Sequence, residues 1–377
     1  MAEGLKDSGH EVDVLTCLPN YPKGRIYDGY RRCISKKETI NGIKVFMYWS
    51  FSTITKNPIL RTIGMLSFAV TLWIFAFKFR KIRSYDCVII QTPPILVAFS
   101  AILLFKILYR KKTVLNVSDL WPISAVELGA IRENSKTHKM LAKIEIFLYK
   151  HSNAIQVQSN EILEHIQKLE PTKKLFLYRN LQKVSPYSAI AERREKPFRI
   201  VYAGLLGVAQ GIYELLQNID FKKLDVEFHI YGGGNQTKLI EDYIKNNPDK
   251  GVYYHGFLPK QDINTVLPQY HASIVPLLVR IRGAVPSKIF DLLPHGVPIL
   301  FCGGGEGAEI VKKFKFGFTS NPGNYKELES NIKKLYEMDN EDYRSIVNNC
   351  ISASKEEFSY DYQMKKYIEF LNMIIKN

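Results

Sequence analysis

One stretch, residues 283–309, constrains the fold more than any other part of the chain. It reads GAVPSKIFDLLPHGVPILFCGGGEGAE, and it predicts a helix opening at a proline-serine pair, a proline-glycine break, a buried strand at residues 297–301 and a glycine cluster. Lys288 and Asp291 fall in the first turns of the helix. A strand that ends in glycines before another helix is typical of a doubly wound α/β domain.

The glycine cluster leaves two interpretations open. If the next helix begins at Glu306 or Gly307, the backbone amides of Gly304, Gly305, Glu306 and Gly307 can approach an anion, and phosphate is the obvious candidate. The alternative is an ordinary strand-to-helix turn that binds nothing. The lysine and the acid on the preceding helix favour the phosphate site.

Several motifs carry a family resemblance. VPSKIFDLLPHGVPIL followed by GEGAEIV resembles the nucleotide-sugar motif of retaining glycosyltransferases of family 4, in the form found in bacterial surface-polysaccharide enzymes of the WbuB type. The other matching stretches follow in the family's order: GHEVDVLT at 9–16, TPP at 92–94, DLWPISAVELGA at 119–130 and YAGLLGVAQGI at 202–212. The resemblance implies an α/β GT-B architecture, with two doubly wound Rossmann-like parallel-sheet domains, an interdomain cleft and a C-terminal crossover helix.

Composition agrees with a two-domain enzyme. The chain has 377 residues with 46% hydrophobic content, which is enough for two cores and excludes disorder. Five cysteines without a CxxC pair argue against a disulfide framework and indicate a reducing cytoplasm. The net charge of +15 indicates a polyanionic partner or surface.

Some partner classes are excluded by missing motifs. No basic stripe interleaves with aromatic residues as in a nucleic-acid-binding module, and no GxGxxG follows the first strand as in a nicotinamide enzyme. We expect no cofactor and no metal, because the sequence has neither a DxD at a strand end nor a His/Cys cluster.

The order of predicted elements sets the domain limits. We expect an acceptor-binding domain at 1–190, a nucleotide-sugar-binding domain at 197–355 and a helix at 356–377 that crosses back to the first domain. The boundary falls in an exposed linker at 186–197. The chain opens with a helix at 1–8, so the strand that precedes this helix in the resembled family is expected to be missing, and with it a glycine-containing loop.

Residues 59–83 form the most unusual segment. Its apolar run at 63–77 is followed closely by Lys78, Arg80, Lys81 and Arg83. A spanning helix needs roughly 20 apolar residues, so about 15 predict a helix that lies in the interface of an anionic membrane or is buried in the core. We favour the membrane surface, which predicts a cytoplasmic protein bound peripherally to the inner face of the cytoplasmic membrane.

A basic and aromatic loop, PNYPKGRIYDGYRR, lies within residues 19–42. Its arginines could grip a diphosphate and its tyrosines could stack on a sugar ring. The alternative is an exposed loop of ordinary composition.

The predicted acceptor side follows a strand at 113–117. Asp119 lies where that strand ends, which is where open α/β sheets place ligands, and it is positioned to accept the acceptor's hydroxyl proton or to bind the sugar. The alternative role is to cap the next helix. Trp121 and Glu127 belong to the same acceptor-side motif.

The predicted donor side combines a second glycine loop with the lysine helix. Gly204, Gly207 and Gln210 follow the first strand of the second domain, and Gly232 ends the next one. Two positions depart from the common family pattern, because Leu205 and Gln210 stand where many relatives have arginine and lysine. The resemblance therefore assigns the positive charge to Lys288.

A third departure concerns the acid pair of the motif. Gly283 stands in place of its first glutamate, and Asp291 in place of the second can still accept hydrogen bonds from ribose hydroxyls.

These observations predict a retaining glycosyltransferase. It would move a sugar, an N-acetylated hexosamine or deoxyhexosamine, from a nucleoside diphosphate, with UDP favoured, to an acceptor on a polyprenyl diphosphate. Asp119 and Lys288 would be the catalytic residues. The alternatives are a GT-B nucleotide-sugar epimerase and a catalytically impaired membrane-bound subunit.

Overall fold

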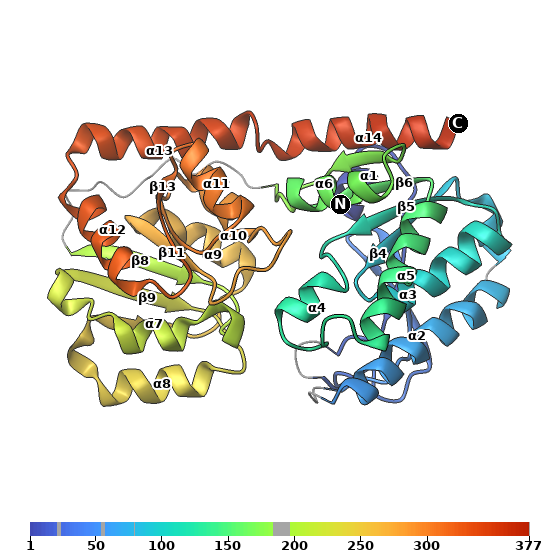
Figure 1. The fold of residues 1–377 in the computed structure, drawn as a ribbon, viewed down its shortest axis with the longest axis horizontal. Coiled ribbons are helices and arrows are strands. Elements are labelled where there is room, and N and C mark those ends of the chain that lie inside the picture. Colours follow the sequence, from blue (N-terminus) through green and yellow to red (C-terminus); the bar gives the residue numbers. More distant parts are fainter. Residues whose placement is uncertain (21–23, 54–56, 79, 184–196, 377) are drawn as a thin grey trace. The chain divides into compact units, whose positions relative to one another are not determined.

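The computed structural model describes residues 1–377 except 21–23, 54–56, 79, 184–196 and 377. It divides into two compact units. Unit 1 consists of Met1–Tyr178 and Gln363–Asn377, and unit 2 of Arg179–Tyr362. Each unit has parallel strands flanked by helices, which confirms the predicted α/β class (Figure 1).

The strands of unit 1 form two sheets. The first has the order β1-β3-β2, in which β1 (Asp13–Cys17) is parallel and β2 (Ser35–Ile40) antiparallel to β3 (Ile43–Tyr48). The second is parallel throughout, in the order β4 (Cys87–Thr92), β5 (Lys112–Val117), β6 (Ala154–Val157) and β7 (Lys174–Leu177). The Tyr85 hydroxyl donates a hydrogen bond to the Asp13 carboxylate, so the amino ends of β1 and β4 lie together.

Helices cover these strands. They are α1 (Ala2–Asp7), α2 (Pro58–Lys78), α3 (Ile95–Ala101), which continues as the π-helical segment η2 (Ile102–Leu108), α4 (Ile123–Glu127), α5 (Lys136–His151), α6 (Asn160–Leu169) and α14 (Tyr360–Lys376), with a short 3₁₀ turn η1 (Arg80–Ser84). The core includes buried side chains of α2, α3, η2, β5 and β6.

The last helix, α14, closes unit 1. Its aromatic side chains pack on β7 and the residue after it, with ring centroids 5.1 Å apart for Phe370 and Phe176 and 4.8 Å apart for Tyr367 and Tyr178. The Tyr367 hydroxyl also donates a hydrogen bond to the Gln156 side chain on β6. The chain thus enters unit 1 twice, as the predicted crossover helix requires.

Unit 2 contains one parallel sheet of six strands, in the order β10-β9-β8-β11-β12-β13. Their bounds are β8 (Phe198–Ala203), β9 (Val226–Tyr231), β10 (Val252–Tyr254), β11 (Ala272–Pro276), β12 (Ile299–Cys302) and β13 (Gly317–Ser320). Every residue of β11 and β12 is buried, because parallel strands in the middle of a sheet are covered on both faces.

The helices of unit 2 are α7 (Ile212–Asn218), α8 (Thr237–Asn246), α9 (Lys260–Val266), α10 (Lys288–Leu292), α11 (Glu306–Lys313), α12 (Tyr325–Glu337) and α13 (Asn340–Lys355), joined by short 3₁₀ turns. They bury the second core, to which Phe198, Phe228, Phe301 and Tyr202 contribute large side chains.

Two details of the organisation differ from the sequence prediction. Unit 1 ends at Tyr178, earlier than the predicted 190, because Arg179 and Leu181 are buried in unit 2. Most of the predicted linker at 186–197 lies outside the described residues. The region 19–42, predicted as a loop, contains the strand β2.

Candidate active site

The loops after β8, β9, β11 and β12 meet at the carboxyl edge of the unit 2 sheet. Backbone hydrogen bonds join them: Gly204 N to Tyr231 O (2.9 Å), Leu206 N to Gly233 O (3.0 Å), Leu278 N to Ala209 O (3.0 Å) and Leu277 N to Cys302 O (2.7 Å). The loop after β11 therefore lies between the two glycine loops. This edge is where doubly wound sheets bind ligands.

Lys288 lies over the first glycine loop. Ser287 precedes α10, and the half-buried Lys288 is the first residue of that helix. A Cβ atom placed on Gly204 would lie 2.3 Å from Lys288 Cε and 2.6 Å from Nζ, so a side chain at position 204 would displace the end of the lysine from this loop. The Lys288 ammonium also lies 5.3 Å from the centroid of the Tyr202 ring. The structure thus brings the predicted cation to the predicted glycine loop.

Tyr202, which sequence reasoning did not single out, stabilises this loop from the core of unit 2. Its side chain is buried, and its hydroxyl donates a 2.6 Å hydrogen bond to the carbonyl of Leu205. Burial raises the pKa of the Tyr202 hydroxyl, which keeps it protonated as a donor.

Gly232 touches the same loop from β9. A Cβ atom on Gly232 would lie 1.8 Å from the Gly204 carbonyl oxygen, and its φ of 144° is one that residues with side chains rarely adopt. The predicted donor positions Gly204 and Gly232 are therefore in backbone contact. Their glycines are required by close approach of two loops.

Gln210 faces Gly207 in the same loop. Its Oε1 atom lies 2.8 Å from the Cβ position of Gly207. That oxygen is buried and has no hydrogen-bond partner among the described residues. A buried acceptor without a partner is rare, and a ligand hydroxyl would satisfy it.

The second glycine loop precedes α11, which begins at Glu306 as predicted. Gly305 has a φ of 68°, and the Gly303 amide donates to the Ser320 carbonyl at 2.9 Å. A Cβ atom on Gly304 would lie 3.3 Å from Arg280 Cδ, so the aliphatic part of Arg280 covers this loop. A second cationic side chain thus adjoins Gly304, Gly305 and the amide end of α11.

Glu306 belongs to the donor prediction through its backbone amide, and its side chain has a separate, structural role. Its carboxylate is buried and accepts a 2.6 Å hydrogen bond from Arg179 Nη2, while the Arg179 guanidinium lies 5.6 Å from the Phe290 ring. The Glu306 carboxylate is therefore a structural anchor. Only its backbone amide, with that of Gly307, stays at the predicted phosphate position.

Asp291 lies on α10 one turn after Lys288 and is half-buried. Its neighbours Ile289, Phe290 and Leu292 are buried in the core and fix the helix. Lys288 and Asp291 thus share one short helix start, as predicted.

The predicted acceptor residues lie in unit 1. Asp119 follows β5 by two positions and is half-buried, and its burial raises the pKa of its carboxyl group. Two glutamines that sequence reasoning missed hold the preceding residue, Ser118. Gln91 Nε2 and Gln158 Nε2 donate hydrogen bonds to Ser118 Oγ at 2.6 Å and 3.1 Å. The carboxyl ends of β4, β5 and β6 are thereby tied together beside Asp119.

Trp121 and Glu127 differ in their exposure. Trp121 is half-buried and packs against the core of unit 1. Glu127 is the last residue of α4 and is exposed. Trp121 therefore has at least a packing role.

The chain is similar to known glycosyltransferases in sequence. Residues 197–338 match the family model described as glycosyl transferases group 1. The chain is 23% identical over 316 residues to the putative colanic acid biosynthesis glycosyl transferase WcaI of Escherichia coli, covering 78% of this chain and 76% of the relative. It is 23% identical over 297 residues to the probable glycosyltransferase WbjE of Pseudomonas aeruginosa, covering 74% and 73%.

Solved structures give the fold. Sucrose-phosphate synthase from Thermosynechococcus elongatus matches with a TM-score of 0.74 at 13% identity, over 100% of this chain and 92% of that chain. Anabaena HepE in complex with UDP matches with a TM-score of 0.60 at 14% identity, over 83% and 84%. The match to the glycosyl transferases group 1 model at 197–338 and this fold together indicate a glycosyltransferase enzyme with two Rossmann-like GT-B domains.

Proposed function

We propose that the protein is a retaining glycosyltransferase of bacterial surface polysaccharide synthesis, which moves an N-acetylated hexosamine or deoxyhexosamine from a UDP-sugar to a polyprenyl-diphosphate-linked acceptor. The observation that carries the proposal is Lys288 lying over Gly204 at the carboxyl edge of the unit 2 sheet. The similarity to a relative named for colanic acid biosynthesis and to HepE, whose structure contains UDP, supports it.

Charge stabilisation supplies the proposed chemistry on the donor side. As the glycosidic bond breaks, negative charge builds on the leaving diphosphate. The Lys288 ammonium and the amides of Gly207 and of residues 304–307 are the groups that would meet it, and one preorganised donor is worth about 3 kcal/mol in a transition state. Asp291 would accept hydrogen bonds from the ribose. This proposal needs no metal ion.

Asp119 would act on the acceptor. A carboxylate at a strand end, half-buried and with a raised pKa, is a stronger base than an exposed aspartate. It would accept the proton of the acceptor hydroxyl, or hold that hydroxyl in place while the leaving diphosphate takes the proton.

The lipid of the proposed acceptor lies in a membrane, so the enzyme needs a surface that contacts the membrane. The helix α2 is the candidate. By length and composition, residues 59–77 form a helix that could cross a membrane. One face of α2, however, is packed on unit 1, where Phe75 contacts Phe46 and Tyr48 and the Trp73 indole donates a 2.9 Å hydrogen bond to Ser100. This packing supports a helix that lies along the folded unit.

The other face of α2 carries an exposed apolar stripe at helical spacing. Its side chains are between 44% and 69% exposed: Ile59, Ile63, Leu66, Val70, Ile74 and Phe77. Exposed Ile107 and Leu108 adjoin its end, because the Tyr109 hydroxyl donates to the Ala76 carbonyl at 2.9 Å. We define Ile59 to Phe77 of this face as the α2 stripe.

Basic residues lie at the same end. Arg83 and Arg110 are exposed, and Lys111 donates hydrogen bonds to the carbonyls of Arg83 (2.6 Å) and Tyr85 (2.9 Å), which brings these segments together. An apolar stripe with cations at one end is typical of interfacial helices on anionic lipid. We propose peripheral attachment to the inner face of the cytoplasmic membrane.

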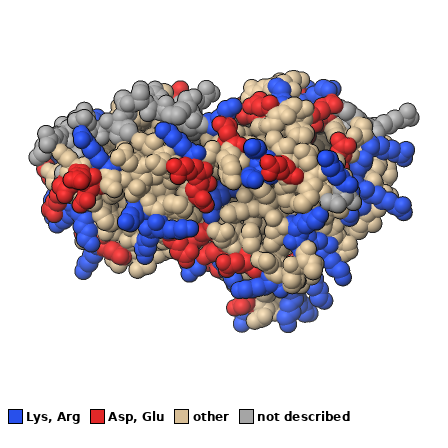
Figure 2. Space-filling view, turned by 90° about the horizontal axis from the view of Figure 1, so that it is seen from above, with Lys and Arg blue, Asp and Glu red and all other residues tan. Residues whose placement is uncertain are grey.

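The face of the molecule seen in Figure 2 does not favour nucleic acid as a partner. Figure 2 shows basic and acidic side chains interspersed on the visible face rather than a single basic stripe. A mixed surface of this kind gives no continuous track for a phosphate backbone.

A transfer assay tests the proposal. The full chain is incubated with UDP-sugars and vesicles that contain a polyprenyl-diphosphate-linked acceptor, and UDP release is followed together with the anomeric configuration of the product. Transfer with retained configuration is expected. UDP-sugar interconversion without transfer would instead indicate an epimerase, and UDP binding without turnover a catalytically impaired subunit.

A further inference from the structure

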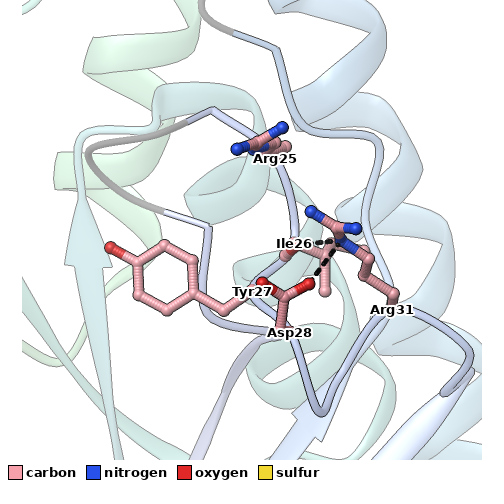
Figure 3. A pocket seen from close by; sticks show the side chains of 5 residues that line it. All are labelled: Arg25, Ile26, Tyr27, Asp28 and Arg31. Atoms are coloured by element: carbon pink, nitrogen blue, oxygen red, sulfur yellow. Dashed lines mark hydrogen bonds and ion pairs between the residues drawn. The ribbon is translucent and has the colours of Figure 1, made fainter.

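The loop between β1 and β2 encloses a cavity that the proposed mechanism does not use. It measures about 250 Å³ and is lined by Arg25, Ile26, Tyr27, Asp28 and Arg31. Figure 3 shows the Arg31 guanidinium between the Asp28 carboxylate and Arg25. We call this cavity the arginine pocket.

Hydrogen bonds shape the loop around the arginine pocket. Two backbone bonds close it on itself, Gly24 N to Asn20 O at 2.7 Å and Tyr27 N to Pro19 O at 3.0 Å. At its far end, the Tyr30 hydroxyl donates to the Glu38 carboxylate at 3.0 Å. These contacts hold the loop in one conformation and attach it to the strand β2, which contains Glu38.

A second set of contacts fixes the charge of that end. The Lys36 ammonium pairs with Glu38 at 2.7 Å and lies 4.1 Å from the centroid of the Tyr30 ring. Glu38 is thus neutralised by a lysine outside the pocket, and its negative charge does not oppose an anion there.

Arg31 is oriented by its Nε atom alone. Within the described part of the loop, Nε lies 3.1 Å from the Asp28 carboxylate and 3.4 Å from the Ile26 carbonyl. Its two terminal nitrogens are directed to the side of Arg25 (Figure 3). Two guanidinium groups against one carboxylate leave the arginine pocket with a net positive charge.

We propose that the arginine pocket binds the diphosphate of the lipid-linked acceptor. Guanidinium groups match phosphate oxygens in a bidentate geometry, and two of them suit two adjacent phosphates. Arg25 and Arg31 are exposed, so a ligand can enter from the surface. The pocket lies beyond the carboxyl end of β1, in the unit that also carries Asp119.

The same loop is joined to the segment that leads into α2. The Trp49 amide donates to the Ile34 carbonyl at 2.8 Å, and the Phe51 amide donates to Ser67 Oγ of α2 at 2.8 Å. A head group bound in the arginine pocket would therefore lie on the part of unit 1 from which the proposed lipid-facing helix starts. Its role as an acceptor site rests on the proposed function, whereas diphosphate binding does not.

Calorimetry with inorganic pyrophosphate tests the pocket. The full chain carries Lys288→Ala to remove the lysine of the donor site, and Arg25→Gln, Arg31→Gln or Arg32→Gln is added. Arg32 is the matched control, because it is exposed in the same loop and does not line the pocket. We expect Arg25→Gln and Arg31→Gln each to weaken pyrophosphate binding about tenfold or more, since a charge-assisted bond is lost, and Arg32→Gln to leave it unchanged. Equal binding by all variants would overturn the proposal.

Vesicles identify the source of the diphosphate. Phosphatidylcholine vesicles doped with polyprenyl diphosphate should bind the parent more tightly than vesicles with equal charge from phosphatidylglycerol, and Arg31→Gln should abolish the difference. If only free pyrophosphate distinguishes the variants, the pocket takes a soluble diphosphate and the lipid assignment is wrong. UDP binding is measured with the parent and with Arg31→Gln to separate the two proposals. A parent protein that does not bind UDP would refute the proposed function alone.

Discussion

At two positions of the donor site, close contacts with neighbouring chain segments favour glycine. Gly204 admits the Lys288 side chain, and Gly232 admits the Gly204 carbonyl. The amides of both glycines are hydrogen-bonded to the Tyr231 and Gly256 carbonyls, so the spacing of these glycines is a packing requirement of the site. A matched pair of glycine substitutions can distinguish this packing requirement from a general disturbance of the loop.

Gly232→Ala should destabilise unit 2, because its Cβ would lie 1.8 Å from the Gly204 carbonyl and its φ is 144°. We expect a loss of about 1 to 3 kcal/mol in urea unfolding, together with weaker UDP binding. Gly233→Ala is the control, since nothing lies within 4 Å of its Cβ position. Equal stability of the two variants would show that the loops separate freely.

Asp119 gives a pH-dependent prediction. Burial raises its pKa above the ordinary value of 3.8, so the folded protein binds the proton more tightly than the unfolded chain. Ionisation of Asp119 therefore costs stability as the pH rises through this range. Asp119→Asn should be at least as stable as the parent at neutral pH, and the difference should vanish below pH 3.8.

The same variant should lose transfer by about 10²- to 10⁴-fold, since a positioned base contributes that much. UDP affinity should stay unchanged. Unfolding is followed in urea at several pH values, and transfer by UDP release. An Asp119→Asn enzyme with full activity would remove Asp119 from the acceptor side.

Residue-level prediction from the sequence reached as far as local patterns allow. Lys288 and Asp291 could be identified because the helix start and the glycine cluster lie close together in the sequence. The pair of Arg179 and Glu306 was not, because its partners are 127 positions apart and only the fold joins them. Local sequence patterns therefore pointed only to the backbone amide of Glu306 and did not reveal the pairing of its carboxylate with Arg179.

Among the elements, α2 shows how one helix serves two surfaces. Its apolar content predicted either a membrane helix or a core helix. The structure gives it a packed face and the exposed α2 stripe, which periodicity alone could not separate because both faces are apolar.

Replacing Ile63, Val70 and Ile74 with serine should release the protein from anionic vesicles. All three are exposed, whereas Trp73 is hydrogen-bonded to Ser100 and would confound the test. Each apolar side chain buried in lipid contributes about 1.5 to 3 kcal/mol, so binding should weaken a hundredfold or more. The fold should be retained, as judged by cooperative unfolding.

The control for this variant places serine at Leu128, Leu169 and Leu239, which are exposed to a similar degree away from α2. That control should bind vesicles like the parent. Unchanged vesicle binding by the α2 variant would show that the stripe does not face lipid.

The strand β2 was missed although a local signal was present. Asn41 and Gly42 have φ values of 50° and 75° and form the tight turn of the β2–β3 hairpin, and an Asn-Gly pair is the commonest mark of such a turn. The strand itself reads SKKETI, with one apolar residue, and its mostly exposed position explains the absence of alternation.

At the scale of the whole molecule, two parallel-sheet units divide the proposed work. The predicted donor residues gather in unit 2 and Asp119 lies in unit 1. The class of both units was implied by the family resemblance, which rests on motifs spread along the chain. The donor sugar does not follow from either, because it depends on side chains that contact a ligand.

Calorimetric titration of UDP and pyrophosphate into the parent, Lys288→Ala, Asp291→Ala and Lys312→Ala tests the central claim most directly. Lys312 is an exposed control at the end of α11. We predict that Lys288→Ala weakens UDP about tenfold or more, that Asp291→Ala weakens UDP but not pyrophosphate, and that Lys312→Ala changes neither. UDP binding of equal strength in all four proteins would contradict a donor site at the carboxyl edge of unit 2.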